Sequence, residues 1–237
     1  MSSSIVISSQ FRGPPNSGNG GYVCGLLAAR IEGPATVMLR APIPLDTPLL
    51  LVEEDGVVRL TAEDGTLIGE ARPADATGLT EVPAPPPLAS VAAAGLRFPG
   101  LERRFHPVCF TCGDQLEEGF GLRVFTGQLE GGEAGLVAGP WTVRAEFVDE
   151  DGLAPPEIVW AALDCPGSVA WVVGGGGAGL LGTMTGEILR RPAVGELTTV
   201  LAWPMEQSGR KRISGTALFS SDGVLLARSR QVWITFA

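Results

Sequence analysis

The sequence predicts an α+β fold made of two similar units, each an antiparallel sheet with one long central helix. The order of elements in residues 1–74 recurs in residues 101–237, and a proline- and alanine-rich linker or surface crossing, residues 75–100, separates the halves. Each half holds one apolar segment long enough for a helix and ends in β-rich runs joined by an Asp-Gly turn. A sheet with one apolar face needs a cover, which one helix per half can supply.

The composition describes the core and excludes some partners. Of 237 residues, 45% are hydrophobic and only 6% aromatic, so aliphatic side chains must fill the core. A net charge of −9 argues against a nucleic-acid backbone or an anionic membrane as partner. The N-terminal residues lack the basic start and apolar core of a signal peptide, and the four cysteines are irregularly spaced. We therefore expect a soluble cytoplasmic protein with reduced thiols.

The first unit begins with a glycine-rich turn and a helix. The turn is NSGNGGYVCG, and the apolar run that it opens predicts a helix over residues 20–31. Two β-rich runs follow within residues 36–52, separated by a short turn. The unit closes with a hairpin, because Asp64-Gly65 between two β-rich runs is a strong hairpin signal.

The second unit repeats this order after an additional hairpin at residues 121–148. Its helix is predicted over residues 156–173, and Pro155 and Pro156 stand at the helix start, where a missing N–H costs little. The second Asp-Gly turn, at residues 222–223, predicts the closing hairpin.

Short motifs recur after the helix in both units. Leu-Arg-x-Pro occurs at residues 39–42 and 189–192. The order of these elements resembles the hotdog fold of acyl-CoA thioesterases. It consists of a helix, a strand that ends in Arg-Pro, a Gly-x-Leu turn and an Asp-Gly-x-Leu-x-Ala hairpin. Two such units in one chain resemble the double-hotdog members. The resemblance implies two antiparallel sheets, each wrapped around its helix and paired as a pseudodimer, and it allows further pairing into homo-oligomers.

Asp164 is an acid that interrupts the apolar helix of the second unit, where apolar residues recur at helical spacing. A carboxylate among apolar residues is costly to bury unless it is paired or used in function. The alternative is an acid on the solvent face, or one that caps Gly167 and Ser168.

The hotdog resemblance gives Asp164 a role. In single-domain hotdog thioesterases of the phenylacetate-pathway type, a Gly-Gly pair opens the central helix. An Asp or Glu seven residues beyond the second glycine serves there as nucleophile or general base. Asp164 stands at this acid position, but Pro156-Glu157 replaces the glycines. In the first unit Gly20-Gly21 opens the helix, but Ala28 stands at the acid position.

Paired hotdog units build each site at their interface, from the helix start of one unit and the acid of the other. The resemblance therefore implies one complete site, from Gly21 and Asp164, and one dead site, from Pro155-Pro156 and Ala28. Unpaired N–H groups at the Gly20-Gly21 helix start would stabilise the oxyanion of an acyl-CoA-type thioester. Asp164 would attack the thioester or take a proton from water. No cofactor is implied beyond the coenzyme A of the substrate.

Four further polar residues are predicted to assist. Asn19 precedes the Gly-Gly pair, where it contacts substrate or caps the helix. Gln231 follows a strand that resembles the last strand of medium- and long-chain double-hotdog thioesterases, where a Gln orients the nucleophilic water. Thr183 and Thr185 lie on the strand that carries the acid in those relatives and are predicted substrate contacts. The alternative for all three strand residues is ordinary sheet surface.

Arg210, Lys211 and Arg212 form a basic cluster in an acidic chain. They predict a contact with the phosphates of coenzyme A, to which Arg190 and Arg191 could add. The alternative is a solvated hairpin turn.

Cys109 and Cys112 form a Cys-x-x-Cys motif. Cys24 and Cys165 lie on the two predicted helices and His106 is adjacent, so a metal site can be drawn, but zinc prefers four ligands. The motif also resembles the Cys-Phe-x-Cys-Gly turn that precedes the first strand of many single hotdog proteins. We predict a structural turn and no metal.

Two functions stay open at this stage. One is hydrolysis of an acyl-CoA-type thioester through Asp164. The other is a non-catalytic acyl-thioester-binding protein on the same scaffold, because fold alone does not decide function. The single histidine, His106, is away from both predicted helices, which argues against a Ser-His-Asp hydrolase and a histidine-dependent dehydratase.

Overall fold

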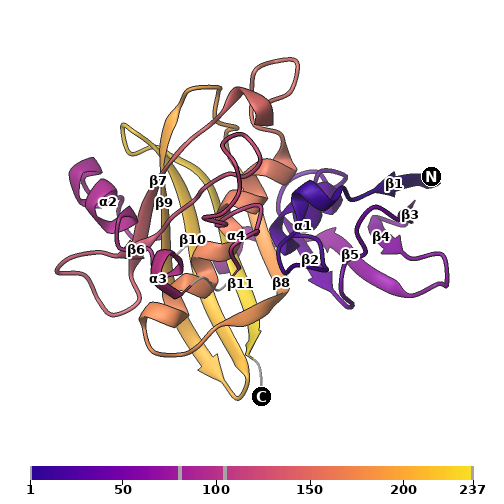
Figure 1. Cartoon of the computed structure of the whole chain (residues 1–237). Helices are drawn as coiled ribbons and strands as arrows, with labels where there is room; N and C mark the ends of the chain where they lie inside the picture. The colour runs from indigo at the N-terminus through magenta and orange to yellow at the C-terminus, as the bar shows by residue number, and fades with distance from the viewer. Residues whose placement is uncertain (1, 80–81, 104–105, 236–237) are drawn as a thin grey trace.

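The strands form one continuous antiparallel sheet in the computed structural model, which describes residues 2–79, 82–103 and 106–235. Within these ranges the strand order is β1-β3-β4-β5-β2-β8-β11-β10-β9-β7-β6 (Figure 1). The strands are β1 (Ser2–Val6), β2 (Ala35–Leu39), β3 (Pro48–Glu54), β4 (Val57–Thr61), β5 (Leu67–Pro73), β6 (Gly127–Gln128), β7 (Val137–Thr142), β8 (Gly179–Ile188), β9 (Leu197–Ser208), β10 (Lys211–Ser220) and β11 (Leu225–Thr235).

The two units join through one pair of strands, which corrects the prediction of two sheets. Strand β2 of the first unit pairs with β8 of the second, with Thr36 opposite Thr185 and Val37 opposite Met184. An edge strand presents a row of unpaired N–H and C=O groups, and here each unit satisfies the edge of the other. The α+β class is as predicted, but a single sheet runs through the molecule.

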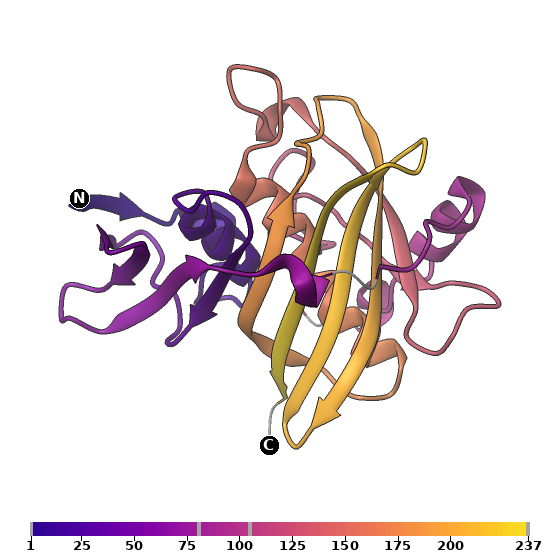
Figure 2. The ribbon, with the colours of Figure 1, turned by 180° about the vertical axis from the view of Figure 1, so that it is seen from behind.

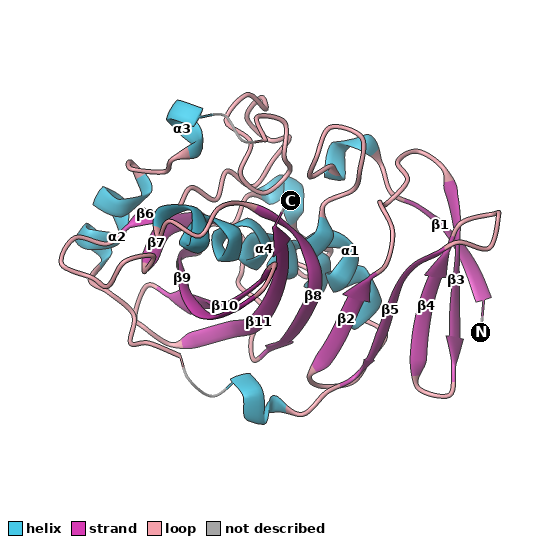
Figure 3. Cartoon of the chain, turned by 90° about the horizontal axis from the view of Figure 1, so that it is seen from below, coloured by secondary structure: helices cyan, strands magenta, loops and turns pink. Residues whose placement is uncertain are grey.

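Two helices lie against the same face of this sheet, and they are the central helices that the sequence predicts. Helix α4 (Pro156–Val173) has the predicted bounds, whereas α1 (Gly20–Ala28) ends three residues before the predicted end. Figure 3 shows β9, β10, β11 and β8 curving around α4, with α1 beside it over β2 and β5. No helix in the described part of the chain is long and apolar enough to cross a membrane.

One hydrophobic core spans both units. Val23 and Leu27 of α1 belong to the same buried cluster as Val159 and Leu163 of α4 and Met184 of β8. The aliphatic composition accounts for this core, since it contains few rings. The two predicted units are therefore packed around a shared interior.

The described residues of the predicted linker, 75–79 and 82–100, lie at the surface of the sheet. They contain the 3-10 turn η2 (Ala76–Leu79), which lies against β8 and β11, where Arg228 Nη1 donates to the Leu79 carbonyl at 2.7 Å. Figure 2 shows this turn on the face of the sheet opposite α4. Helix α2 (Leu88–Gly95) then packs on β7 at the far edge, and α3 (Gly100–Arg103) follows. The further 3-10 turns are η1 (Ser9–Phe11) and η3 (Ala145–Phe147).

Both Asp-Gly turns close hairpins, as predicted. Asp64-Gly65 joins β4 to β5 and Asp222-Gly223 joins β10 to β11. Gly65 and Gly223 have φ values of 85° and 83°, the left-handed region that favours glycine. The additional hairpin of the second unit is present as β6 and β7, although β6 is only two residues long.

Candidate active site

Two glycines let α1 and α4 approach closely. A Cβ on Gly21 would lie 2.5 Å from the Asp164 Cβ, and one on Gly25 would lie 2.4 Å from the Glu157 Cα. Gly21 and Gly25 are four residues apart and so lie on the same face of α1. Only glycine permits this contact, because any side chain would force the helices apart. The glycine-rich stretch thus brings the start of α1 against the middle of α4.

This contact joins Gly21 to Asp164. The Gly21 N–H donates to Asp164 Oδ2 at 2.9 Å, within the positive end of the α1 dipole. Asp164 is 3% exposed, and its other oxygen, Oδ1, has no hydrogen-bond partner among the described residues. The helix start of one unit and the acid of the other are therefore in direct contact across the interface.

Burial changes the chemistry of Asp164. Loss of solvation disfavours the ionised carboxylate and raises the pKa of Asp164 to about 7, although the Gly21 N–H acts in the opposite direction. A carboxyl group with a pKa near neutrality is a stronger base than an ordinary aspartate, and it is still ionised in a large fraction of molecules at pH 7.

A cavity of about 660 Å³ opens beside this pair. Asp164 and the first helical residue, Gly20, line it. Its apolar wall includes Leu39, Ile43, Phe98, Val169, Val172, Leu181 and Trp233. Its polar lining includes Asn19, Arg40, His106, Asp114 and Ser168. Such a volume, mostly apolar with a few polar groups, is typical of a small-molecule site.

Asn19 caps α1 and holds a neighbouring loop. Its Oδ1 accepts from the Tyr22 N–H at 2.8 Å, and its Nδ2 donates to Thr111 Oγ1 at 3.2 Å. The residue is 1% exposed, so its amide is used in the structure at both ends. The structure shows Asn19 as the cap of α1, and because Asn19 also borders the cavity, its contact with substrate stays a prediction.

Gln231 lies beneath α4 and outside the cavity lining, which corrects its predicted place beside the nucleophilic water. Its Nε2 donates to the Leu163 carbonyl at 2.7 Å, and its Oε1 accepts from Trp233 Nε1 at 2.9 Å. Across the sheet its partner is Met184, so no acid faces it on β8. Gln231 instead supports the turn of α4 that carries Asp164, and it orients a tryptophan of the cavity wall.

The two threonines lie at the junction of the units. Thr185 Oγ1 and Thr36 Oγ1 are 2.8 Å apart across β2 and β8, and Thr183 is opposite Met38 in the same pair of strands. Neither threonine is among the residues that line the cavity. The structure shows both threonines where the two units join, and their contact with substrate stays a prediction.

The basic cluster lies at the β9–β10 hairpin and not in the cavity lining. Arg210 Nε donates to the Thr235 carbonyl at 3.0 Å, and Arg212 Nε donates to the Gly176 carbonyl at 3.1 Å. Lys211 begins β10 in the same hairpin. Their contact with the phosphates of coenzyme A stays a prediction, and it would have to occur outside the residues that line this cavity.

Arg40 is a cavity residue that the sequence analysis did not select. It follows β2 within the first Leu-Arg-x-Pro motif, and Glu70 Oε1 holds its Nη2 at 3.2 Å. The Leu-Arg-x-Pro motif is a signal that could have indicated Arg40, because the motif places an arginine just after the strand beside α1. Ser168, one turn beyond Asp164 on α4, was considered only as a cap partner, and its i+4 spacing places it on the same helix face.

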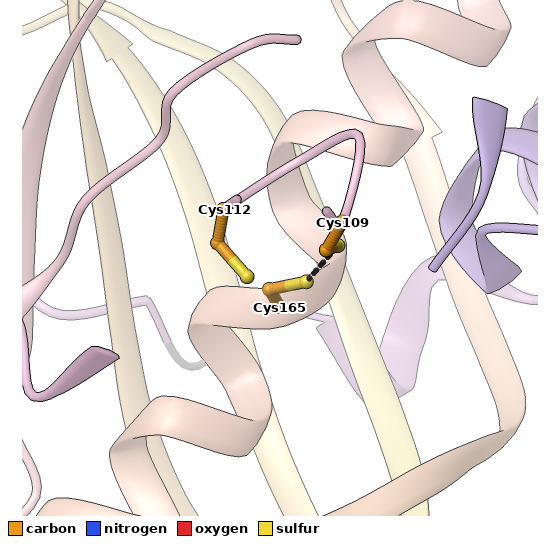
Figure 4. A group of neighbouring side chains, drawn as sticks. All are labelled: Cys109, Cys112 and Cys165. Atoms are coloured by element: carbon orange, nitrogen blue, oxygen red, sulfur yellow. Dashed lines mark hydrogen bonds between the residues drawn. The ribbon is translucent and has the colours of Figure 1, made fainter. Parts of the chain in front are cut away.

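Three cysteines meet beside the acid (Figure 4). Cys109 and Cys112 come from the loop before β6, and Cys165 follows Asp164 on α4. The Cys109 and Cys165 sulfurs are 3.5 Å apart. The pKa of Cys109 is lowered because the thiols of Cys112 and Cys165 donate hydrogen bonds to its sulfur. The fourth cysteine, Cys24, is buried on α1 outside this group.

No protein-family model and no curated protein matches the chain. Two solved structures are similar at full length. A candidate thioesterase from Novosphingobium aromaticivorans has a TM-score of 0.63 and 14% identity, over 100% of this chain and 96% of that chain. The tesB protein of Mycobacterium avium subspecies paratuberculosis has a TM-score of 0.61 and 15% identity, over 99% of this chain and 93% of that chain. These likenesses show that the chain has the double-hotdog fold.

Proposed function

We propose that this double-hotdog chain hydrolyses an acyl-CoA-type thioester at the interface of its two units. The observation that carries the proposal is the contact between Asp164 and the start of α1 at the wall of an apolar cavity. A basic carboxylate, a helix N-terminus and an apolar tunnel are the parts that thioester hydrolysis requires. The names of the two similar structures, a candidate thioesterase and a tesB protein, support the same reaction.

Asp164 is the general base in this proposal. The Gly21 N–H holds Oδ2, and Oδ1 is buried without a partner among the described residues. Oδ1 is therefore the oxygen that accepts the proton of a water that enters from the cavity. The water oxygen forms a bond to the thioester carbon, and the bond to the thiolate of coenzyme A breaks. The raised pKa of Asp164 favours proton transfer from water, with the geometry as the main support.

The oxyanion donor is the Gly20 N–H. The sequence analysis selected Gly21, but its N–H points at Asp164. Gly20 is the first residue of α1 and lines the cavity, and no described residue accepts its N–H. An unpaired N–H at a helix start is aimed at developing negative charge and is strengthened by the helix dipole.

The acyl chain occupies the apolar part of the cavity, and Arg40 contacts the anionic part of coenzyme A. Arg40 is half exposed at the cavity, a suitable place for a phosphate that stays partly solvated. The pseudosymmetric position, with Pro155-Pro156 and Ala28, offers no N–H at the helix start and no carboxylate. We therefore propose one working site per chain.

The test is release of coenzyme A from a panel of acyl-CoA thioesters of increasing acyl length. Asp164→Asn should keep the Gly21 hydrogen bond through its amide oxygen and lower kcat about 10²- to 10⁴-fold, the usual contribution of a general base. Asp151→Asn, at an exposed acid before α4, is the matched control and should keep wild-type turnover. Undiminished activity in Asp164→Asn would refute the assignment. Binding of acyl-CoA without release of coenzyme A would favour the non-catalytic function.

A further inference from the structure

Three thiols from two distant segments converge beside the cavity. The sulfurs of Cys109, Cys112 and Cys165 all lie within 4.8 Å of one another, and all three residues line the cavity. Figure 4 shows the first two on one loop, facing the third on α4. From the sequence alone we predicted no metal, because no pattern placed the other possible ligands beside the Cys-x-x-Cys motif. The fold brings one of them, Cys165, to the two motif thiols.

We propose that Cys109, Cys112 and Cys165 bind one zinc ion as three thiolates, with the fourth coordination position open to the cavity. Zinc–sulfur bonds of about 2.3 Å in a tetrahedral site place the sulfurs roughly 3.8 Å apart. The Cys109–Cys165 separation of 3.5 Å and the 4.8 Å limit for the group are within a small side-chain rotation of that geometry. Thiolate ligands select soft or borderline metals such as zinc over magnesium or calcium.

The surroundings of Cys109 are those of a thiolate ligand. Asn19 Nδ2 donates to its sulfur at 3.8 Å, and the Cys165 sulfur lies 3.5 Å from it. A hydrogen bond of this kind holds a ligand in orientation and stabilises its charge. The cap of α1 therefore supports the sulfur of Cys109 next to α4.

The loop is shaped tightly around this sulfur. The Gly113 N–H donates to the Cys109 carbonyl at 2.7 Å, and a Cβ on Gly113 would lie 2.5 Å from that oxygen. Phe110 anchors the loop from the other side, with its ring edge-on to Phe11 and Tyr22 at centroid distances of 5.0 and 5.9 Å. The loop therefore presents both of its thiols to α4 in a defined arrangement.

The number of thiols favours a metal over a disulfide. A disulfide between two of these cysteines would leave the third thiol beside it without a chemical partner. A metal ion uses all three, and its positive charge compensates thiolates that would otherwise be costly to bury together. Bound zinc would tie the loop to α4 at the residue next to Asp164.

Zinc binding to the full chain tests this proposal without any activity assay. Reduced, chelator-treated protein should bind one zinc ion per chain in competition with a chromogenic chelator, and cobalt should produce a thiolate-to-metal charge-transfer band. Cys112→Ser and Cys165→Ser should each weaken zinc binding at least about 100-fold, since loss of an outer-shell partner alone costs up to that factor.

Two controls separate this site from the proposed catalytic site. Cys24→Ala removes the one cysteine outside the group, and Asp164→Asn removes the base, and both should bind zinc like the wild type. The proposal is overturned if wild-type protein binds no zinc, or if Cys112→Ser binds it equally well. It is also overturned if mild oxidation with oxidised glutathione forms a Cys109–Cys165 disulfide in zinc-treated protein as readily as in metal-free protein.

Discussion

The Gly21 N–H donates a 2.9 Å hydrogen bond to Asp164 Oδ2, between residues that are 143 positions apart in the chain. It links the start of one central helix to the middle of the other, where a Cβ on Gly21 would collide with Asp164. The same contact that packs the two units also leaves the other carboxylate oxygen, Oδ1, buried without a hydrogen-bond partner among the described residues. Packing and proposed catalysis therefore depend on the same pair of residues.

Substitution of Gly21 by alanine should disturb both the packing of α1 on α4 and the proposed catalysis. The added Cβ would lie 2.5 Å from the Asp164 Cβ and 2.7 Å from the Trp160 carbonyl, so α1 and α4 must separate. We expect Gly21→Ala to lower the free energy of unfolding by about 1–3 kcal/mol, as overpacked cores do, and to reduce kcat. Chemical denaturation and the coenzyme A release assay measure the two effects.

The matched control for that experiment is Gly78→Ala, because a Cβ on Gly78 meets open space. It should change the free energy of unfolding by no more than about 0.5 kcal/mol. Equal stability of Gly21→Ala and Gly78→Ala would contradict the close helix contact.

Pre-steady-state kinetics should distinguish the two roles considered for Asp164. A general base forms no covalent intermediate, so coenzyme A release should follow a single phase without a burst, and intact-mass analysis of quenched enzyme should find no acylated protein. A burst that equals the enzyme concentration, with the acyl group mapped to Asp164, would establish the nucleophilic role in its place.

Arg40 should recognise the coenzyme A part of the substrate. We expect Arg40→Gln to raise KM for acyl-CoA roughly tenfold, which corresponds to about 1.4 kcal/mol, and to leave KM unchanged for an acyl thioester of a short thiol without phosphates. Steady-state kinetics with both substrates measure this difference. The control variant is Arg210→Gln, in the hairpin outside the cavity lining. It should change the KM of neither substrate.

Gln231 should contribute to stability through its buried hydrogen bonds. Gln231→Leu removes the donor to the Leu163 carbonyl and leaves Trp233 Nε1 without its acceptor. Each buried polar group left unpaired costs about 1–3 kcal/mol, so a fall of at least that size in the free energy of unfolding is expected. Gln207→Leu, at an exposed position of β9, should have little effect on denaturation. A loss of activity at unchanged stability would restore the water-orienting role.

Glu70 should make stability depend on acid pH. The hydrogen bond from Arg40, with a further contribution from Arg72, lowers the pKa of Glu70 in the folded chain. The stabilisation by ionised Glu70 is complete above the pKa that Glu70 has in the unfolded chain. It is lost as pH falls through the lower pKa that Glu70 has in the folded chain. The difference in unfolding free energy between wild type and Glu70→Gln should therefore be largest near neutrality and shrink below about pH 4.3.

Denaturation curves from pH 7 to pH 3 measure that difference. Glu63→Gln, at an exposed carboxylate outside these ion pairs, corrects for the loss of one negative charge. The prediction would be contradicted if the difference in unfolding free energy between wild type and Glu70→Gln increased as pH falls.

Local patterns in the sequence were sufficient for the central helix of the second unit and for both closing hairpins, but they did not predict α2, which lies within the predicted linker. Both Asp-Gly hairpins and the bounds of α4 follow from turn chemistry and apolar spacing, which act over a few residues. Gly21 and Asp164 could be matched because their positions in the two helices carried family-like spacing. The resemblance to hotdog proteins holds at the level of the fold.

Other site residues depend on contacts between segments that no local pattern relates. Gln231 resembles a catalytic residue in its strand, yet the packing of α4 over the sheet buries it. Asn19 has a side chain that suits a ligand or a cap, and the nearby Tyr22 N–H makes it a cap. Arg40 reaches the cavity only because β2 runs beside α1 and β8.

The sequence by itself determined the two central helices and the two Asp-Gly hairpins. Tertiary structure alone decided that β2 and β8 merge the sheets, that the Gly21 N–H points at Asp164, and that Cys165 joins the Cys-x-x-Cys loop. The physical reason is range. Dihedral preferences and apolar periodicity act between neighbours in the chain, whereas hydrogen bonds and thiol clusters require atoms that only the packed core brings within a few ångströms.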